Sequence, residues 1–333
     1  MTRRKFVRLA GTALALVNLP AAAKLASAAA WAPPQFGGIT PNDKFYLTSY
    51  GGTPLIDPAT WSLKIKGLVE NPLELSYADI RKLPMLKRRL TLECISNPPD
   101  GTAISNADWV GTKLKPILDR AHVKPEARYV AMRAADNYYT GAPREEIMRE
   151  ENFLPYQMNG QVLPREHGFP VRIFIPGKYG MKQPKWITEI EFLPVEFRGY
   201  WEERGWSHTA WRKVNSGFFS PRPRDGLATL LGGSVDINGP TDFHGWALAG
   251  PSGIKRVDIS LDEGASWRDA EILDNRSPYV WTIWRYRFRP SQAGSVVIRV
   301  RATDGNGASQ LLEDRQVGEG ISSQARMTLK VSL

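Results

Sequence analysis

The chain has 333 residues, of which 42% are hydrophobic and 10% aromatic, enough for one large folded domain or two smaller ones. This composition excludes an intrinsically disordered chain. The formal net charge is +10, but five basic residues and no acids lie within residues 1–30, so removal of that segment lowers the charge from +10 to +5. A charge this small does not predict nucleic-acid binding.

Residues 1–30 have the pattern of an export signal, which takes no part in a mature fold. The pair Arg3-Arg4 before a weakly apolar run resembles a twin-arginine signal, so we expect a periplasmic protein that is exported in its folded state. The alternative is a general secretory signal with two incidental arginines. Asn18 and Pro20 interrupt the apolar run, so no stable membrane anchor is expected.

Segments typical of strands and helices mix between residues 39 and 193. Strands are predicted over residues 61–69, 88–94, 171–177 and 186–194, and a short capped helix over residues 76–84. This mixture predicts an α+β domain rich in loops, which we place at residues 31–225.

The pattern changes after the Pro- and Arg-rich segment at residues 220–226. Short alternating strands follow, separated by Gly, Asp and Asn turns. About seven strands without a long helical segment predict an all-β, immunoglobulin-like sandwich over residues 226–333. The segment SLDEGASW predicts a hairpin turn in which Asp262 bonds the backbone and Gly264 takes a positive φ. Because this motif occurs once, it does not indicate a propeller.

Cys94 is the only cysteine, which excludes an internal disulfide and a Cys-rich metal site. No C-x-x-C-H motif is present, so no covalently attached haem is expected. Cys94 ends a predicted strand before a polar loop, where ligands often bind. The ordinary alternative is a small buried side chain, although an exported thiol must be buried or bound to resist oxidation. Lys87, Arg88 and Arg89 could favour the thiolate or form a solvated surface.

Two further segments concentrate charged and aromatic residues. The first holds His167 and Arg172 five residues apart, and a Gly-rich turn with Lys182 and Lys185 follows. This set suits a phosphate. The second places Asp136 before two tyrosines and a Gly turn. Each segment alone has an ordinary alternative: a core histidine, surface lysines or packed tyrosines. Together with the cysteine they predict a site with one soft sulfur ligand and an anion-binding wall.

The ordered motifs NDKFY, TLECISN, NADWVGTKL, HGFPVR, PGKYGMKQPKW and HGWALAG…IKRVDISLDEGASW resemble the sulfite oxidase family of molybdopterin enzymes over essentially the whole mature chain. The resemblance implies a molybdopterin-binding α+β domain, a C-terminal immunoglobulin-like domain used for dimerisation, and one molybdenum-molybdopterin per chain without haem. It implies that Cys94 is the thiolate ligand of molybdenum and that Tyr138 lies beside the metal's oxo group, with Tyr139 as the alternative. The residues implied to bind the cofactor are Tyr46, Leu47, Asp136, His167, Arg172, Lys182, Gln183, Pro184 and Lys185.

The chain departs from the sulfite-oxidising pattern in two places. Residues 48–50 read Thr-Ser-Tyr where those relatives carry Arg-Asn-His, and Pro98-Pro99 replace arginines. Each lost charge-assisted donor would weaken the binding of a small dianion by roughly 1.5 to 3 kcal/mol, so sulfite is not the expected substrate. Arg144 or the linker at residues 220–224 could compensate.

We therefore expect an exported mononuclear molybdenum oxidoreductase that performs two-electron oxygen-atom transfer between water and a small, sulfur-containing substrate. The expected partners are this substrate, an electron-transfer protein such as a c-type cytochrome, and a second copy of the chain bound through the C-terminal domain. Two alternatives remain open: a sulfoxide reductase of the periplasmic methionine-sulfoxide-reductase type, and a cofactor-free exported binding module. The intact set of Cys94, His167, Arg172 and Lys185 favours an enzyme.

Overall fold

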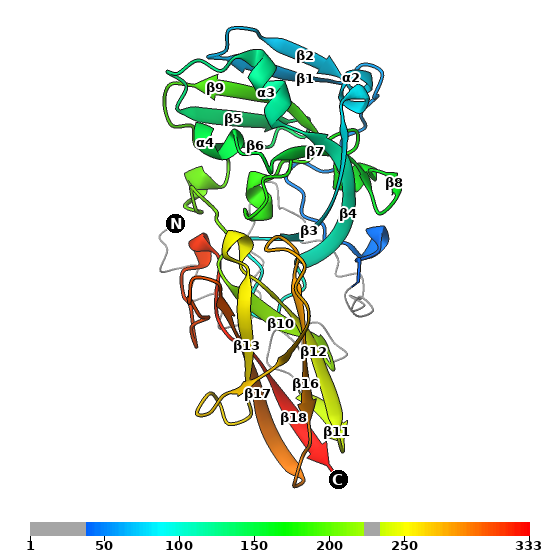
Figure 1. The fold of residues 1–333 in the computed structure, drawn as a ribbon, viewed down its shortest axis with the longest axis vertical. Helices are drawn as coiled ribbons and strands as arrows, with labels where there is room; N and C mark the ends of the chain where they lie inside the picture. The colour runs from blue at the N-terminus through cyan, green and yellow to red at the C-terminus, as the bar shows by residue number, and fades with distance from the viewer. Residues whose placement is uncertain (1–37, 223–233) are drawn as a thin grey trace.

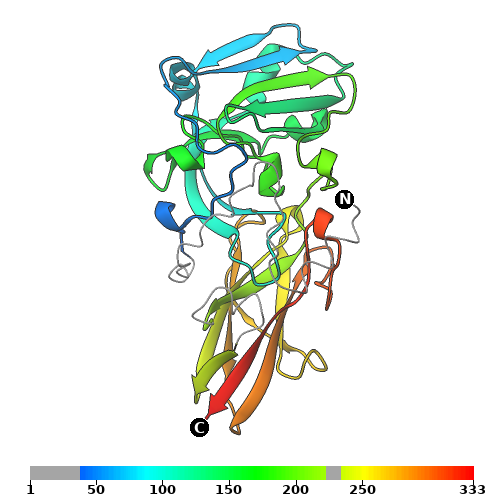
Figure 2. The same ribbon diagram turned by 180° about the vertical axis from the view of Figure 1, so that it is seen from behind.

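The computed structural model describes residues 38–222 and 234–333, so the predicted export signal lies outside the described residues. The described chain forms two bodies, an α+β domain and a β-sandwich, drawn one above the other in Figure 1. The C-terminus lies at the tip of the sandwich farthest from the first domain, as Figures 1 and 2 both show. The predicted α+β domain followed by an all-β sandwich is confirmed.

The first domain is built on two sheets. The five-stranded sheet has the order β2 (Leu73–Ser76), β1 (Ser62–Gly67), β9 (Ile187–Leu193), β5 (Tyr129–Ala134) and β6 (Tyr139–Pro143). The four-stranded sheet has the order β3 (Met85–Glu93), β4 (Ile104–Lys113), β7 (Phe153–Met158) and β8 (Gln161–Val162). Helices α2 (Tyr77–Lys82), α3 (Lys115–Ala121) and α4 (Arg144–Ile147) and the 3-10 turns η2 (Arg165–His167) and η3 (Gly180–Lys182) lie between these strands, whereas η1 (Asn42–Lys44) precedes them and η4 (Glu202–Arg204) follows them.

The local sequence explains these elements. In β1, Leu63 and Ile65 are fully buried while the lysines between and after them point outward, which is the period-2 pattern of a half-buried strand. Helix α2 begins with a capping box, because the Ser76 hydroxyl accepts from the amide of Asp79 and the Asp79 carboxylate accepts from the amide of Ser76. The predicted helix and the strands β1, β3 and β9 are therefore confirmed.

The predicted strand over residues 171–177 does not form. The segment is buried and makes a single isolated bridge, between Phe174 and Phe153. Its successive amides donate to different partners: Arg172 to the carbonyl of Pro155, and Ile173 to the carbonyl of Pro184. An apolar run of this length cannot distinguish a ladder strand from a buried connection, because the apolar pattern reports burial and not pairing.

The sandwich contains two sheets within the described residues. One has the order β10 (Asn215–Ser220), β12 (Thr241–Leu248), β16 (Thr282–Phe288) and β15 (Glu271–Asp274). The other has the order β11 (Ser234–Asn238), β18 (Ala325–Ser332), β17 (Gly294–Asp304), β13 (Ile254–Ser260) and β14 (Arg268–Asp269). The 3-10 turns η5 (Gly250–Ser252) and η6 (Val317–Glu319) lie in its connections. The predicted hairpin is present, since Asp262 accepts from the amide of Ser266 and Gly264 has φ +97°.

The sandwich begins earlier than the sequence indicated. Strand β10 was assigned to the first domain by the boundary at residue 225, but it pairs with β12 and packs Phe218 into the sandwich core. The Pro- and Arg-rich segment thus follows the first sandwich strand instead of preceding it. The change of pattern after residue 226 marked a connection inside the second domain.

The two domains meet through a shared apolar cluster and a buried ion pair. Ile104 of β4 packs with Trp246, Trp281 and other side chains of the sandwich. The carboxylate of Glu93, directly before Cys94, lies 3.7 Å from the guanidinium of Arg212, and both side chains are almost fully buried. Burial raises the pKa of Glu93, and Arg212 opposes that rise.

Two asparagine amides complete the contact around Glu93. One oxygen of Glu93 accepts hydrogen bonds from the side chains of Asn97 at 3.1 Å and Asn215 at 2.9 Å. Asn97 belongs to the loop after the cysteine, and Asn215 begins strand β10 of the sandwich. The carboxylate therefore ties the strand that bears Cys94 to the second domain.

Replacement of Glu93 by alanine should destabilise the whole protein. It leaves the buried guanidinium of Arg212 without a counter-charge, which costs about 3 to 5 kcal/mol. Chemical denaturation of the wild type and the Glu93→Ala variant measures the loss. Glu313→Ala is the control, because Glu313 pairs with Arg315 at 2.7 Å in solvent and its loss should cost at most about 1 kcal/mol. Equal effects of the two substitutions would contradict the anchoring role of Glu93.

Candidate functional site

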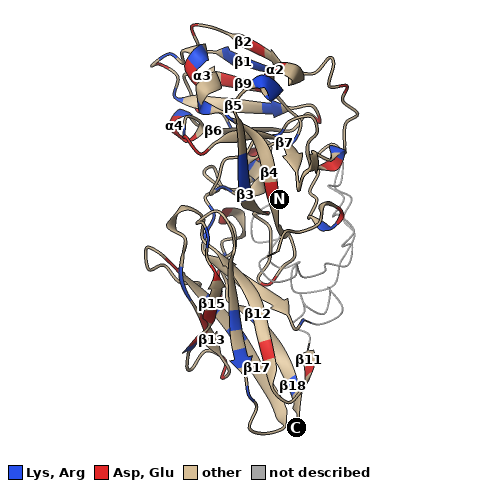
Figure 3. Cartoon of the chain, turned by 45° about the vertical axis from the view of Figure 1, so that its right-hand side comes forward, with Lys and Arg blue, Asp and Glu red and all other residues tan. Residues whose placement is uncertain are grey.

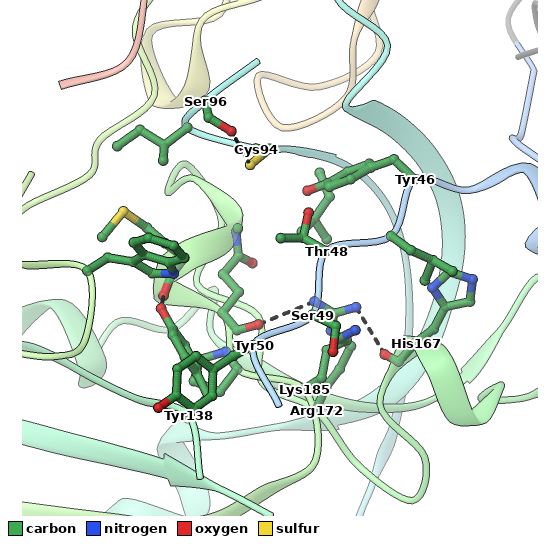
Figure 4. Close-up of a pocket in the computed structure, with 18 of the residues that line it drawn as sticks. Tyr46, Thr48, Ser49, Tyr50, Cys94, Ser96, Tyr138, His167, Arg172 and Lys185 are labelled. Atoms are coloured by element: carbon green, nitrogen blue, oxygen red, sulfur yellow. Dashed lines mark hydrogen bonds between the residues drawn. The ribbon is translucent and has the colours of Figure 1, made fainter. Parts of the chain in front are cut away.

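A cavity of about 260 Å³ lies in the first domain at the end of β3. Residues from several segments of the domain form its wall: residues 45–50, Leu92, 94–96, Asp136, Tyr138, His167, Arg172, Gly180, Met181 and 183–185, together with Trp201 and Trp206. Figure 4 shows Cys94 and Ser96 at one edge, Tyr138 and Tyr50 on one side, and His167 on the other. Residues far apart in the sequence are thus brought to a single space.

The backbone of Cys94 is fixed by hydrogen bonds, whereas its sulfur is partly exposed to the cavity. Its amide donates to the carbonyl of Ala103 at 2.9 Å, and its carbonyl accepts from the amide of Asn97 at 3.0 Å. Its Sγ lies 3.1 Å from the hydroxyl of Ser96 and is partly exposed toward the cavity. A thiol fixed in this way can bind a ligand without reorganisation of the strand.

The basic residues before the cysteine have no part in this cavity. Lys87 and Arg89 contact the carboxylate of Asp108 at 3.4 and 2.8 Å, and Arg88 donates to a carbonyl of Glu151 at 2.9 Å. These residues form the basic stretch visible on β3 in Figure 3. None of the three side chains reaches the cavity of Cys94, because Lys87 and Arg89 pair with Asp108 and Arg88 is engaged with Glu151.

Arg172 is a buried cation that faces the cavity. It donates to the carbonyls of His167 at 3.0 Å and Gln183 at 3.3 Å, and its Nε has no hydrogen-bond partner. Within residues 38–222 and 234–333 no carboxylate forms an ion pair with it. Its guanidinium lies 4.8 Å from the ring centre of Phe174. Burial lowers the pKa of Arg172 to about 10, so it remains charged at neutral pH. A buried cation of this kind favours a bound anion.

Lys185 and His167 extend the same wall. The ammonium group of Lys185 donates to the carbonyl of Glu166 at 2.8 Å and lies 4.3 Å from the ring centre of Trp186. Burial, then repulsion by Arg172, lowers the pKa of Lys185 to about 7. The Nε2 of His167 lies 2.9 Å from the carbonyl of Asn42. An anion beside these groups would favour the protonated form of Lys185.

Tyr138 borders the opposite side of the cavity. Its hydroxyl donates to the carbonyl of Met181 at 2.6 Å, and its amide donates to the carboxylate of Asp136 at 3.1 Å. Burial raises the pKa of Tyr138 well above its usual value, so the hydroxyl stays protonated. Burial also raises the pKa of Asp136. The hydroxyl of Tyr139 instead donates to Glu203 at 2.9 Å and lies outside the cavity.

Ten of the eleven residues predicted for the site line the cavity: Tyr46, Leu47, Cys94, Asp136, Tyr138, His167, Arg172, Gln183, Pro184 and Lys185. Lys182 does not. The η3 turn directs its side chain into the core, where it pairs with Glu202 and donates to the carbonyl of Gly141 at 2.6 Å. The side chain of Lys182 therefore does not reach the cavity, and its position gives no support to the predicted cofactor contact.

Several lining residues were not predicted. Trp201 and Trp206 come from the segment GYWEERGW, and Ile95, Ser96 and Met181 complete the same part of the wall. The dense aromatic run is the signal that could have identified the tryptophans. Among the described residues that line the cavity, Arg172 is the only arginine. Neither Arg144 nor the described part of the linker compensates for the missing arginines, and Arg222 pairs with Asp100 at 3.1 Å.

No helix of residues 38–222 and 234–333 is long and apolar enough to cross a membrane. No three His, Cys, Asp or Glu side chains in residues 38–222 and 234–333 are grouped so that they could hold a metal ion.

Known proteins are similar to this chain over both domains. The oxidoreductase molybdopterin-binding domain model matches residues 50–201, and the Mo-co oxidoreductase dimerisation domain model matches residues 212–313. The chain is 32% identical over 177 residues to an uncharacterised oxidoreductase, YuiH, of Bacillus subtilis, covering 52% of this chain and 87% of that protein. Human mitochondrial sulfite oxidase is 31% identical over 308 residues, covering 79% of this chain and 55% of that enzyme.

Further sulfite oxidases and one solved structure are also similar to this chain. Sulfite oxidase of Arabidopsis thaliana is 29% identical, and the match covers 70% of each chain. The chain spans 54 to 64% of the length of the animal sulfite oxidases that it matches. Its fold is similar to that of the sulfane dehydrogenase SoxCD from Paracoccus pantotrophus, with a TM-score of 0.71 and 24% identity, over 82% of this chain and 74% of that one. The chain belongs to the sulfite oxidase family of molybdopterin-dependent oxidoreductases.

Proposed function

We propose that this protein holds one molybdenum-molybdopterin per chain and transfers an oxygen atom between water and a small sulfur compound. The observation that carries the proposal is the position of Cys94, whose sulfur faces the same cavity as the buried Arg172, a cation without a carboxylate partner. The names of the relatives, sulfite oxidase and sulfane dehydrogenase, support a sulfur substrate.

The residues present fit the expected cofactor. The unpartnered Nε of Arg172 and the ammonium of Lys185 provide donors for a phosphate. Gly168 (φ +116°) keeps this wall compact, since a Cβ there would lie 3.0 Å from the Cβ of Arg172 and 3.2 Å from that of Lys185. A thiolate is the donor that a soft metal prefers, and Cys94 provides one. Cys94 would bind molybdenum, while Arg172, Lys185 and His167 would hold the pterin and its phosphate.

The chain's own groups have separate tasks. Bound molybdenum would supply a two-electron centre for oxygen-atom transfer. The protonated hydroxyl of Tyr138 would mark the substrate side of the cavity, and the cationic wall would orient the cofactor. In the oxidative direction the substrate gains one oxygen atom from water, and two protons and two electrons are released. A separate one-electron carrier, such as a c-type cytochrome, would accept these electrons singly.

The reverse reaction is the second candidate. The absence of any lining arginine except Arg172 in the described chain favours a substrate without the charge of sulfite. Reduction of a sulfoxide fits that condition. No observation favours the cofactor-free binding module, because the chain belongs to an enzyme family and the set of cavity residues is intact.

The assembly and the location of the protein are also proposals. The match of residues 212–313 to a dimerisation domain supports a homodimer through the sandwich. We further propose that Arg3-Arg4 direct export of the folded protein to the periplasm, which would follow insertion of the cofactor in the cytoplasm.

Elemental analysis tests the cofactor assignment. We expect about one molybdenum per chain in wild-type protein from a molybdenum-replete host, and a reduced or labile content with no activity in Cys94→Ala, because the soft sulfur ligand is lost. Arg172→Gln should lower the content through weaker phosphate binding. Arg222→Gln, outside the cavity, is the control. Full activity of Cys94→Ala, or well-folded wild type without molybdenum, would overturn the assignment.

The pH dependence of stability tests the burial of His167. Burial lowers the pKa of His167 to about 4, whereas an unfolded histidine titrates near 6.5. Between these values the unfolded chain binds more protons, so the cofactor-free protein should lose up to about 3 kcal/mol from this group as the pH falls from 6.5 to 4. Denaturation of wild type and His167→Asn measures this as a pH-dependent difference. Parallel curves would show that His167 is not buried in its neutral form.

Cell fractionation tests export. Replacement of Arg3 and Arg4 by lysine should retain the protein in the cytoplasm, since a twin-arginine signal depends on both guanidinium groups. Arg8→Lys makes the same change outside the pair and should leave export intact. Normal export of the double variant would indicate the general secretory route.

A further inference from the structure

One half of the cavity is aromatic and is not used by the proposed cofactor contacts. Ile95, Met181, Trp201 and Trp206 belong to one apolar cluster, and all four line the cavity. The rings of Trp201 and Trp206 lie 6.1 Å apart at 77°. Edge-to-face packing of this kind gives a rigid wall with a large apolar area.

Tyrosine rings continue this wall to Tyr138. Tyr200 lies 4.9 Å from the ring of Trp201 and 4.4 Å from the ring of Tyr50. Tyr50 in turn lies 6.0 Å from Tyr138. In Figure 4, Tyr50 and Tyr138 lie across the cavity from His167, with Arg172 and Lys185 between the two sides. The aromatic half therefore includes the tyrosine that we place next to the substrate.

No Lys or Arg side chain of the described residues lines the aromatic half of the cavity. The two donors of Arg172 that are engaged point to the carbonyls of His167 and Gln183 on the cationic wall. Arg204, the nearest arginine in sequence to the tryptophans, lies over the ring of Tyr200 at 3.5 Å and donates to that residue's carbonyl. It does not line the cavity. An inorganic oxyanion would lose its water here without gaining a charged partner, which is unfavourable.

A neutral donor is available instead. Thr48 and Ser96 line the cavity; the hydroxyl of Ser96 lies 3.1 Å from the sulfur of Cys94, which leaves Thr48 as the neutral donor for a ligand. A hydroxyl can donate one hydrogen bond to a neutral S=O oxygen without a charge to balance. Together with the aromatic wall, this donor matches a ligand that has one polar oxygen and an apolar body.

The second domain supports the tryptophan wall. The amide of Ser207, next to Trp206, donates to the carbonyl of Gly318 in η6 at 2.8 Å. A Cβ on Gly318 would lie 2.8 Å from the carbonyl oxygen of Gly205, so the two loops are in close contact. The wall is thus fixed by both domains and does not depend on a single loop.

We propose that this aromatic half selects an uncharged organic sulfur compound, a sulfoxide or the corresponding thioether, whose apolar substituent packs against Trp201 and Trp206. The inference rests on the proposed function, because it names the substrate class of the same cavity. The exchange is balanced: thioether and water give sulfoxide, two protons and two electrons, and the electrons pass to the one-electron carrier. The reverse reaction consumes them.

Calorimetric titration with two probes, methyl phenyl sulfoxide and sulfite, tests the proposal on the purified holoenzyme. Wild type should bind the sulfoxide at least about tenfold more tightly than sulfite. Trp206→Leu should weaken sulfoxide binding about tenfold by removing aromatic contact area, and leave sulfite binding and molybdenum content unchanged. Trp206→Phe keeps an aromatic ring and should retain most of the affinity. Trp267→Leu, in the distant hairpin of the sandwich, controls for loss of any tryptophan.

Each outcome decides the proposal. Tighter binding of sulfite than of sulfoxide, or an unchanged affinity in a folded Trp206→Leu variant, overturns it. If that variant does not fold, the ratio of the two wild-type affinities and the Trp206→Phe variant decide. Molybdenum analysis of the same samples separates the two proposals. If the wild type contains no molybdenum but binds the sulfoxide, and Trp206→Leu weakens that binding, the inference is supported and the cofactor assignment is overturned. If the wild type neither contains molybdenum nor binds the sulfoxide, both proposals are overturned.

Discussion

The buried carboxylate of Glu93 is the constraint on which the rest of the structure depends. It lies at the end of β3, one residue before Cys94, and binds Arg212 and the amides of Asn97 and Asn215. A charge removed from water is tolerated in a fold only when such partners surround it. The loop after the cysteine and the first strand of the sandwich are therefore held to the same point, and the wall of the cavity is set by the contact between domains.

In the cavity of the first domain, in contrast, a buried charge lacks an oppositely charged partner within the described chain. Arg172 is buried with no carboxylate partner among the described residues, and Lys185 lies beside it with a pKa lowered to about 7. Lys182, three residues before Lys185, is compensated by Glu202. The fold thus neutralises the lysine that points into the core and leaves uncompensated the cations that face the cavity. Such a site lowers the stability of the empty protein and favours an anion that completes it.

The two halves of the cavity differ in chemistry because they come from different parts of the chain. Its cationic wall is formed by His167, Arg172 and Lys185 of the first domain. The two tryptophans of the aromatic wall come from the segment before the sandwich, and η6 of the sandwich braces that segment at Gly318. A change in the second domain can therefore alter the aromatic wall, where we place the substrate, without touching the proposed cofactor contacts.

Local patterns determined much of this protein from the sequence. Alternation identified β1 and a capped helical segment identified α2, because such patterns depend on neighbours close in the chain. The ordered motifs around Cys94 and Arg172 resembled a known family, and ten of the eleven site residues that this resemblance implied line the cavity. Tertiary structure decided the rest. The direction of the Lys182 side chain, the pairing of β10 with the sandwich, the irregular path of residues 171–177 and the tryptophan wall all depend on partners distant in sequence. A local pattern records that a residue is buried or charged, whereas only the folded chain determines which group it meets.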